Sequence, residues 1–111
     1  MVAEVMNTGR AIQASPFLLK YILHTGKKGY KGGFSFIAPK KSFKTAVARN
    51  QARRRGRSAL KALEQTFSSK DWVSGGYFVF LLKPNAVSCK FSLLVSELEH
   101  VLLKGGILSQ Q

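Results

Sequence analysis

Acidic residues are absent from more than half of this chain. Between Glu4 and Glu64 the sequence has fourteen lysines and arginines and no aspartate or glutamate, whereas the segment from Glu64 to Gln111 has four basic and four acidic residues. Cations confined to one half indicate a binding surface rather than a general means of solubility. The imbalance therefore predicts a polyanionic partner, for which a phosphate backbone is the natural candidate.

Other scarcities exclude whole classes of protein. Cys89 is the one cysteine, so an internal disulfide is excluded and a reducing compartment is favoured. No apolar run approaches the ~20 residues that span a bilayer, and the N-terminus lacks the pattern of a signal peptide. We therefore expect a cytoplasmic protein that does not associate with membranes.

The chain is long enough for one packed domain, which we predict over residues 1–111. Its apolar content of 45% and its eight phenylalanines are typical of a protein with a core. A net charge of +13 opposes folding through self-repulsion. We therefore expect the free protein to be marginally stable and the polyanion-bound form to be more stable.

Residues for a protein-borne active site are also lacking. Glu97 and Glu99 are two residues apart and would point to different sides of a helix, and His24 and His100 flank no residue at metal-ligand spacing. Cys89 fits a small buried residue better than a nucleophile. The sequence predicts no catalytic residue and no metal ion held by the protein alone.

Three segments have the composition of strands. Phe17–Leu23 is so apolar that we expect burial on both faces, and Gly33–Ala38 is expected to pair with it in a hairpin across the turn Thr25–Gly33. Tyr77–Leu82 is aromatic and β-branched on both faces, which predicts a central strand following a loop at Ser74–Gly76.

Helices are expected at both ends and in the middle. Met1–Met6 fits one helical turn, and a long helix is predicted from Ser42 or Thr45 to Phe67. A last helix is predicted with Ser92 as its cap, with its inner face formed by Leu94, Val95, Leu98, Val101 and Leu102. It should end at Gly105–Gly106, and the tail from Gly105 to Gln111 is expected to be frayed.

The long central helix has an apolar stripe beside a cationic stripe. At 100° per residue its apolar side gathers small and aliphatic residues, and Gly56 among them implies a close approach to a neighbouring element. The cationic side is formed by Arg49, Asn50, Arg53, Arg54, Arg57 and Lys61, whereas Arg55 lies away from it. Like charges at i, i+4 repel, so the stripe indicates contact with phosphates rather than a solvated face.

The same segment resembles the protein component of bacterial ribonuclease P. That family has the pattern Lys-x-Ala-Val-x-Arg-Asn-x-x-Lys/Arg-Arg-x-x-Arg, and this chain matches its eight fixed places with Lys44, Ala46, Val47, Arg49, Asn50, Arg53, Arg54 and Arg57. Lys40 and Lys41 match the paired lysines before the helix, and Leu82-Lys83-Pro84 matches the end of a later strand. Gln51 departs from the pattern, since the family usually has arginine there.

The resemblance implies an α+β fold, a single-domain α/β sandwich with a central sheet of about four strands and a C-terminal helix. The Arg-rich helix would lie in an unusual left-handed crossover, and the family's first helix would be shortened. It also implies that the chain is the RNA-binding subunit of a ribonucleoprotein endonuclease that removes the 5′ leader of precursor tRNA. The partner RNA would carry out the hydrolysis with Mg²⁺ bound by that RNA and the substrate.

By this resemblance the partners are the catalytic RNA and precursor tRNA, with no obligate protein partner. The RNA-binding residues would be Lys40, Lys41, Lys44, Arg49, Asn50, Arg53, Arg54 and Arg57. In the family, aromatic residues line a cleft for the single-stranded leader, and the residues expected there in this chain are Phe17, Lys20 and Tyr21.

Two other interpretations remain open. A small ribosomal or general RNA-binding protein would have the same charge without a catalytic assembly. A DNA-binding module could place the basic helix in a major groove, although the short apolar stripe and the lack of dimer signals disfavour it.

Overall fold

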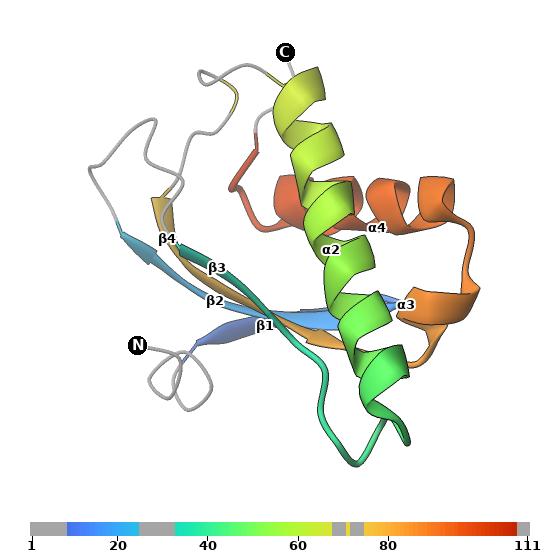
Figure 1. The fold of residues 1–111 in the computed structure, drawn as a ribbon. Helices are drawn as coiled ribbons and strands as arrows, with labels where there is room; N and C mark the ends of the chain where they lie inside the picture. The colour runs from blue at the N-terminus through green and yellow to red at the C-terminus, as the bar shows by residue number, and fades with distance from the viewer. Residues whose placement is uncertain (1–8, 25–32, 68–70, 72–74, 109–111) are drawn as a thin grey trace.

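A computed structural model describes residues 9–24, 33–67, 71 and 75–108. It has two layers, a four-stranded sheet and a set of helices on one of its faces (Figure 1). The elements in chain order are β1 (Arg10–Gln13), β2 (Phe17–His24), β3 (Gly33–Ile37), α2 (Ala46–Thr66), β4 (Gly75–Leu82), α3 (Asn85–Ser88) and α4 (Phe91–Lys104). The predicted α+β sandwich is confirmed. The predicted helical turn at Met1–Met6 and the shortened first helix lie outside the described residues, as does the turn over 25–32.

The strand order is β1-β2-β4-β3, so β4 is central, as predicted. β2 pairs antiparallel with β1 and with β4, whereas β3 pairs parallel with β4. The predicted hairpin between β2 and β3 is therefore wrong. Phe34 and Phe36 of β3 stack instead on Phe78 and Phe80 of β4, each pair with ring centroids 4.9 Å apart. Alternation along a strand indicates which side chains share a face, but it does not indicate which strand lies alongside.

The connection from β3 through α2 to β4 crosses over between adjacent parallel strands. In Figure 1, β3 lies in front of β4, and α2 lies on the same face of the sheet as α4, so the crossover is left-handed, as the resemblance implies. The predicted loop at Ser74–Gly76 is wrong for its two glycines, because Gly75 and Gly76 begin β4 and pair with His24 and Leu23.

The two faces of the sheet differ in burial. Phe17, Leu19 and Tyr21 of β2 are buried on the face covered by the helices, while Leu18, Lys20 and Ile22 are half-buried on the other face. β2 is therefore buried on one face and half-buried on the other, and the prediction of burial on both was wrong. We call the second face, opposite α2 and α4, the open face because none of the described helices lies on it, although Val79 of β4 is buried there.

The long basic helix forms where its sequence predicts. Thr45 caps α2, since its Oγ1 accepts a hydrogen bond from the Ala48 backbone N–H at 3.1 Å. The buried stripe consists of Ala52, Gly56, Ala59, Leu60 and Leu63. A Cβ on Gly56 would lie 2.6 Å from Cδ1 of Phe36, which is the close approach that the sequence implied.

The C-terminal helix completes the core. The residues that cover the sheet are Leu94, Leu98, Val101 and Leu102. Its cap is Lys90 rather than Ser92, because Ser92 already lies within α4, so the predicted cap is wrong. α4 ends at Gly105, and Gly106 has a φ of +75°, a backbone conformation that favours glycine.

The frayed tail predicted from Gly105 is wrong for the described residues that follow it. Ile107 and Leu108 are buried in the core, and the Ile107 N–H donates to the Leu102 carbonyl at 2.9 Å. This part of the tail therefore packs into the core instead of fraying, because its apolar side chains are buried there. Residues 109–111 lie outside the described residues.

Candidate nucleic-acid interface

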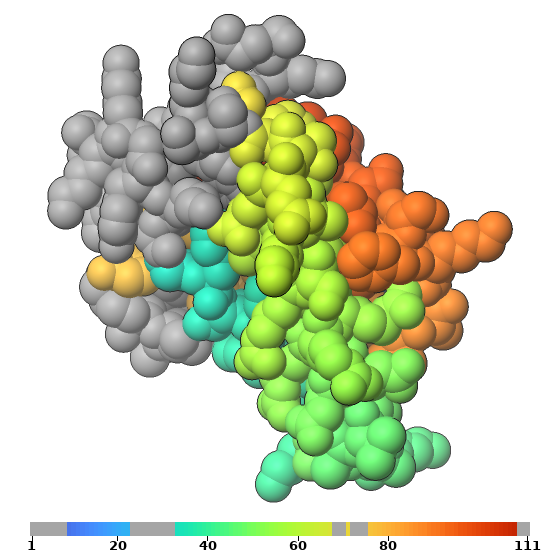
Figure 2. Space-filling view, turned by 45° about the horizontal axis from the view of Figure 1, so that its top comes forward, coloured from blue at the N-terminus to red at the C-terminus, as the bar shows by residue number. Residues whose placement is uncertain are grey.

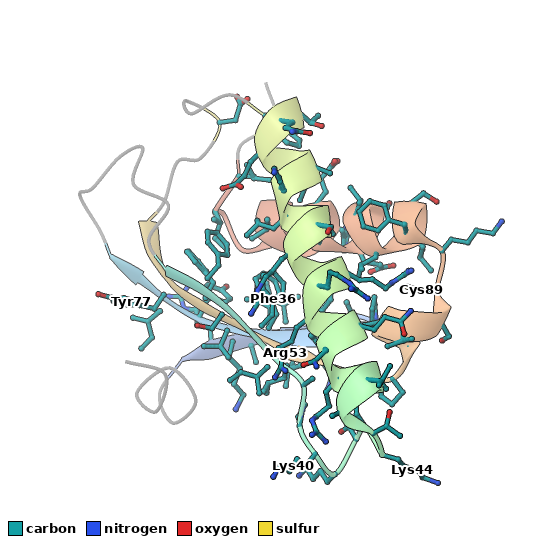
Figure 3. All side chains as sticks on the ribbon, viewed as in Figure 1. Phe36, Lys40, Lys44, Arg53, Tyr77 and Cys89 are labelled. Atoms are coloured by element: carbon teal, nitrogen blue, oxygen red, sulfur yellow. The ribbon has the colours of Figure 1, made fainter. Side chains whose placement is uncertain are left out.

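The eight predicted RNA-binding residues lie together at one end of the molecule. Lys40, Lys41 and Lys44 are exposed on the segment that leads into α2, and the remaining five project from the first half of α2. We call this set the basic surface: Lys40, Lys41, Lys44, Arg49, Asn50, Arg53, Arg54 and Arg57. Figure 2 shows α2 running along the outside of the molecule, with its first turns forming a protruding end. Figure 3 places Lys40 and Lys44 at that end and Arg53 further along α2, on its side toward β3.

The electrostatics of the basic surface are unfavourable without a partner. α2 has no acidic residue in its first turn, although the N-terminus of a helix carries partial positive charge. Its one carboxylate is Glu64, near its C-terminus. Cations gathered at the positive end of a helix repel one another and the helix dipole. An anion at this end would relieve both effects, because backbone N–H groups and side-chain cations would then face the same negative charge.

Arg55 has a different role from the other arginines of α2. Its Nε donates to the Ala86 carbonyl at 2.8 Å, and its Nη2 donates to the Cys89 carbonyl. These acceptors lie within and just after α3, so Arg55 ties α2 to the segment between β4 and α4. The guanidinium is thus used within the fold, which agrees with its position off the cationic stripe in the sequence.

The predicted leader-binding residues do not share one face. Phe17 is 1% exposed and packs edge-on against Phe80, with centroids 5.2 Å apart, and Tyr21 is 5% exposed and stacks on Phe78. Both belong to the core beneath the helices, so neither side chain is exposed to a leader in this structure. Lys20 lies between them in sequence but on the open face. Alternation along β2 dictates this separation.

Sequence reasoning missed an aromatic residue on the open face. Tyr77 of β4 pairs with Ile22, and its neighbour Val79 pairs with Lys20, so Tyr77 and Lys20 share this face on adjacent strands. Tyr77 is half-buried and points away from the helices in Figure 3. Its alternation with buried Phe78 could have identified it, once the pairing of β2 with β4 was known.

Other kinds of site find no support in the described part of the chain. It contains no group of three or more His, Cys, Asp or Glu side chains that could hold a metal ion. Cys89 is half-buried rather than buried, and its thiol is free. Among the helices described, none combines the length and hydropathy needed to cross a membrane.

Comparison with known proteins identifies the family. The family model described as Ribonuclease P matches residues 3–105. This chain belongs to the ribonuclease P family. A search of curated proteins found no match. The family resemblance that the Lys44–Arg57 pattern indicated is therefore confirmed, and the match covers nearly the whole chain.

Solved structures of ribonuclease P proteins share the fold. The protein from Staphylococcus aureus matches with a TM-score of 0.72 at 17% identity, over 97% of this chain and 91% of that one. The protein from Thermotoga maritima matches with a TM-score of 0.71 at 14% identity, over 93% and 89%. At such low identity the likeness supports the four-stranded architecture of this ribonuclease P family member, not the role of any residue.

Proposed function

We propose that this chain is the RNA-binding subunit of a ribonuclease P holoenzyme and assists removal of the 5′ leader from precursor tRNA. The observation that carries the proposal is the basic surface, eight side chains that lie together on a member of this family with no carboxylate among them. Its arginines suit the phosphates of a catalytic RNA, because the planar guanidinium can bind a phosphate through two hydrogen bonds.

In this proposal the RNA performs the chemistry. The catalytic RNA and the substrate would hold the Mg²⁺ needed for hydrolysis of the phosphodiester, and the protein would contribute charge and position. Cations of the basic surface would screen the repulsion between the catalytic RNA and precursor tRNA. The assembly should therefore need less Mg²⁺ with the protein than without it.

The leader is proposed to cross the open face of the sheet rather than the face that holds Phe17 and Tyr21. Lys20 is a half-buried cation on that face, and Tyr77 is a half-buried aromatic residue on the adjacent strand. Stacking of a base on an aromatic side chain contributes about 1–3 kcal/mol. Both residues lie on the same sheet as β3, whose end leads directly to Lys40, so one strand of RNA could run from this face to the basic surface.

The decisive experiment is cleavage of a precursor tRNA by a bacterial ribonuclease P RNA at low Mg²⁺, with and without the protein. A large gain in the single-turnover rate is expected. The variant R54Q/R57Q should lose most of that gain, whereas K90Q/K104Q removes the same charge from the neutral half and should keep it. Tight binding of unrelated structured RNAs without any gain in cleavage would instead favour a general RNA-binding protein. A preference for duplex DNA over RNA at equal salt would favour the DNA-binding interpretation.

Cleavage of substrates with leaders of different length tests the proposed contact between the leader and the open face. If the leader crosses the open face, the gain in rate should fall when the leader is trimmed to one nucleotide, and Y77A should reduce the gain only with the longer leader. An equal gain with both substrates would show that the protein acts through the catalytic RNA alone.

A further inference from the structure

Asn50 and Arg53 are joined by a hydrogen bond within the basic surface. Arg53 Nη2 donates to Asn50 Oδ1, across one turn of α2. The direction of this bond follows from chemistry, because a guanidinium can only donate and Asn50 must therefore present its carbonyl oxygen rather than its amide nitrogen. Asn50 is exposed and Arg53 is half-buried.

Among the described residues, Asn50 is the side chain that orients the guanidinium of Arg53. In Figure 3, Arg53 extends from the flank of α2 that faces β3, the flank on which Gly56 contacts Phe36. Arg53 is half-buried, and the bond to Asn50 sets the direction of its head group. In the described part of the chain, the other N–H groups of this guanidinium have no protein acceptor.

We infer that Asn50 is a positioning residue for Arg53, so that the two side chains form one preorganised donor unit for a phosphate of the RNA backbone. The carbonyl oxygen of Asn50 is used to hold Arg53, which leaves the amide N–H groups of Asn50 and the remaining N–H groups of Arg53 for the ligand. All of these are donors, and they project from one turn of the helix. An anion with several acceptor oxygens, such as a phosphate diester, matches them.

Preorganisation explains why an uncharged residue belongs in this position. A flexible arginine loses conformational freedom when it binds a phosphate, and a side chain already held in place loses less. Arg54 offers a comparison within the same helix, since it lies four residues from Asn50 and is exposed, but no hydrogen bond joins the two. Asn50 should therefore act through Arg53 and not through Arg54.

This inference rests on the proposed binding of RNA by α2, and a double-mutant cycle tests it separately. The dissociation constant for a bacterial ribonuclease P RNA is measured at one salt concentration for the wild type, N50A, R53A and N50A/R53A. N50A should weaken binding about three- to tenfold in the wild type. In the R53A background the same change should weaken binding less than about twofold, because no guanidinium remains to be held.

The matched control is the cycle of N50A with R54A. In that cycle the two factors by which the single substitutions weaken RNA binding should multiply, because Arg54 is not bonded to Asn50. Thermal unfolding of each variant accompanies the titrations, and N50A should not lower the Tm, since alanine favours an exposed helical position more than asparagine does.

Three results would overturn the inference or its basis, and they differ from one another. If N50A costs the same factor with and without Arg53, Asn50 contacts RNA independently. If N50A has no effect on affinity, the bond has no role in binding. If R53A and R54A both leave affinity unchanged, the proposed contact between α2 and RNA is itself wrong.

Discussion

Individual residues of α2 divide between the fold and the ligand, although several are chemically alike. Arg55 bonds to carbonyl groups more than thirty positions away in sequence, while Arg54 beside it is exposed. Gly56 is buried against Phe36, while Ser58, two positions on, faces solvent. Position around the helix axis, rather than residue type, decides which contact each side chain makes.

Gly56→Ala should destabilise the protein although alanine has the higher helix propensity. The gain in propensity is about 1 kcal/mol, whereas overpacking in a filled core typically costs about 1–3 kcal/mol. The new methyl group would lie 2.6 Å from a ring atom of Phe36, and that ring cannot easily yield because it stacks on Phe80. We expect a lower Tm by several degrees in thermal unfolding.

Two variants accompany this measurement. S58A changes an exposed position of the same helix and should leave the Tm unchanged or slightly higher. G56A/F36L provides room for the methyl group and should recover part of the loss. A Tm for G56A equal to or above that of the wild type would show that the helix does not approach β3 as closely as described.

At the scale of elements, short polar contacts hold the connections in place. The turn between β1 and β2 is bound to the end of β4, because Lys83 Nζ donates to the Ala14 carbonyl at 2.9 Å and to Gln13 Oε1 at 3.0 Å. Asn85 Nδ2 donates to Ser15 Oγ at 2.6 Å. Arg55 performs the same task between α2 and α3. Each bond joins elements that the chain itself connects only through long segments.

Arg55→Met should lower stability without changing the electrostatics of RNA binding. The substitution keeps an apolar stem but leaves the carbonyl groups of Ala86 and Cys89 without their charged donor, and such hydrogen bonds contribute about 1.5–3 kcal/mol. A lower Tm is expected, together with an unchanged slope of log affinity against log salt concentration. R54M is the matched control, since it removes the same charge from an exposed position. It should leave the Tm unchanged and reduce the slope by about 0.7–0.9.

At the scale of the whole molecule, charge and apolar packing are segregated. The core lies between the sheet and the helices and has no buried polar or charged residue among those described. Seven cations gather on the basic surface, and four of the five acidic residues lie in the segment that begins at Glu64. Such an arrangement keeps the repulsion at the place where a polyanion binds.

A polyanion should therefore stabilise the free protein. With a net charge of +13, ligation of the native state by inorganic polyphosphate raises the free energy of unfolding by mass action. We expect the Tm to rise with polyphosphate concentration, and to rise less for R54Q/R57Q than for K90Q/K104Q. An equal rise in Tm for both variants would mean that the anion is attracted by the net charge of the protein and does not bind specifically at the basic surface.

The sequence alone determined the features that depend on neighbours along the chain. The limits of α2 were predicted from the sequence, and its buried and cationic stripes follow from a rotation of about 100° per residue. The family follows from the Lys44–Arg57 pattern. Strand β4 and the helix ending at Gly105 were likewise predicted, because their composition and end signals are local.

Only the tertiary structure decided the features that depend on contacts between distant segments. β3 lies beside β4 because their phenylalanines stack, and Phe17 and Tyr21 lie in the core because α2 and α4 cover that face of the sheet. Ile107 and Leu108 are buried for the same reason, and Arg55 finds its acceptors 31 and 34 residues away. A local pattern indicates which residues share a face, but the free energy of packing between elements decides which face is covered.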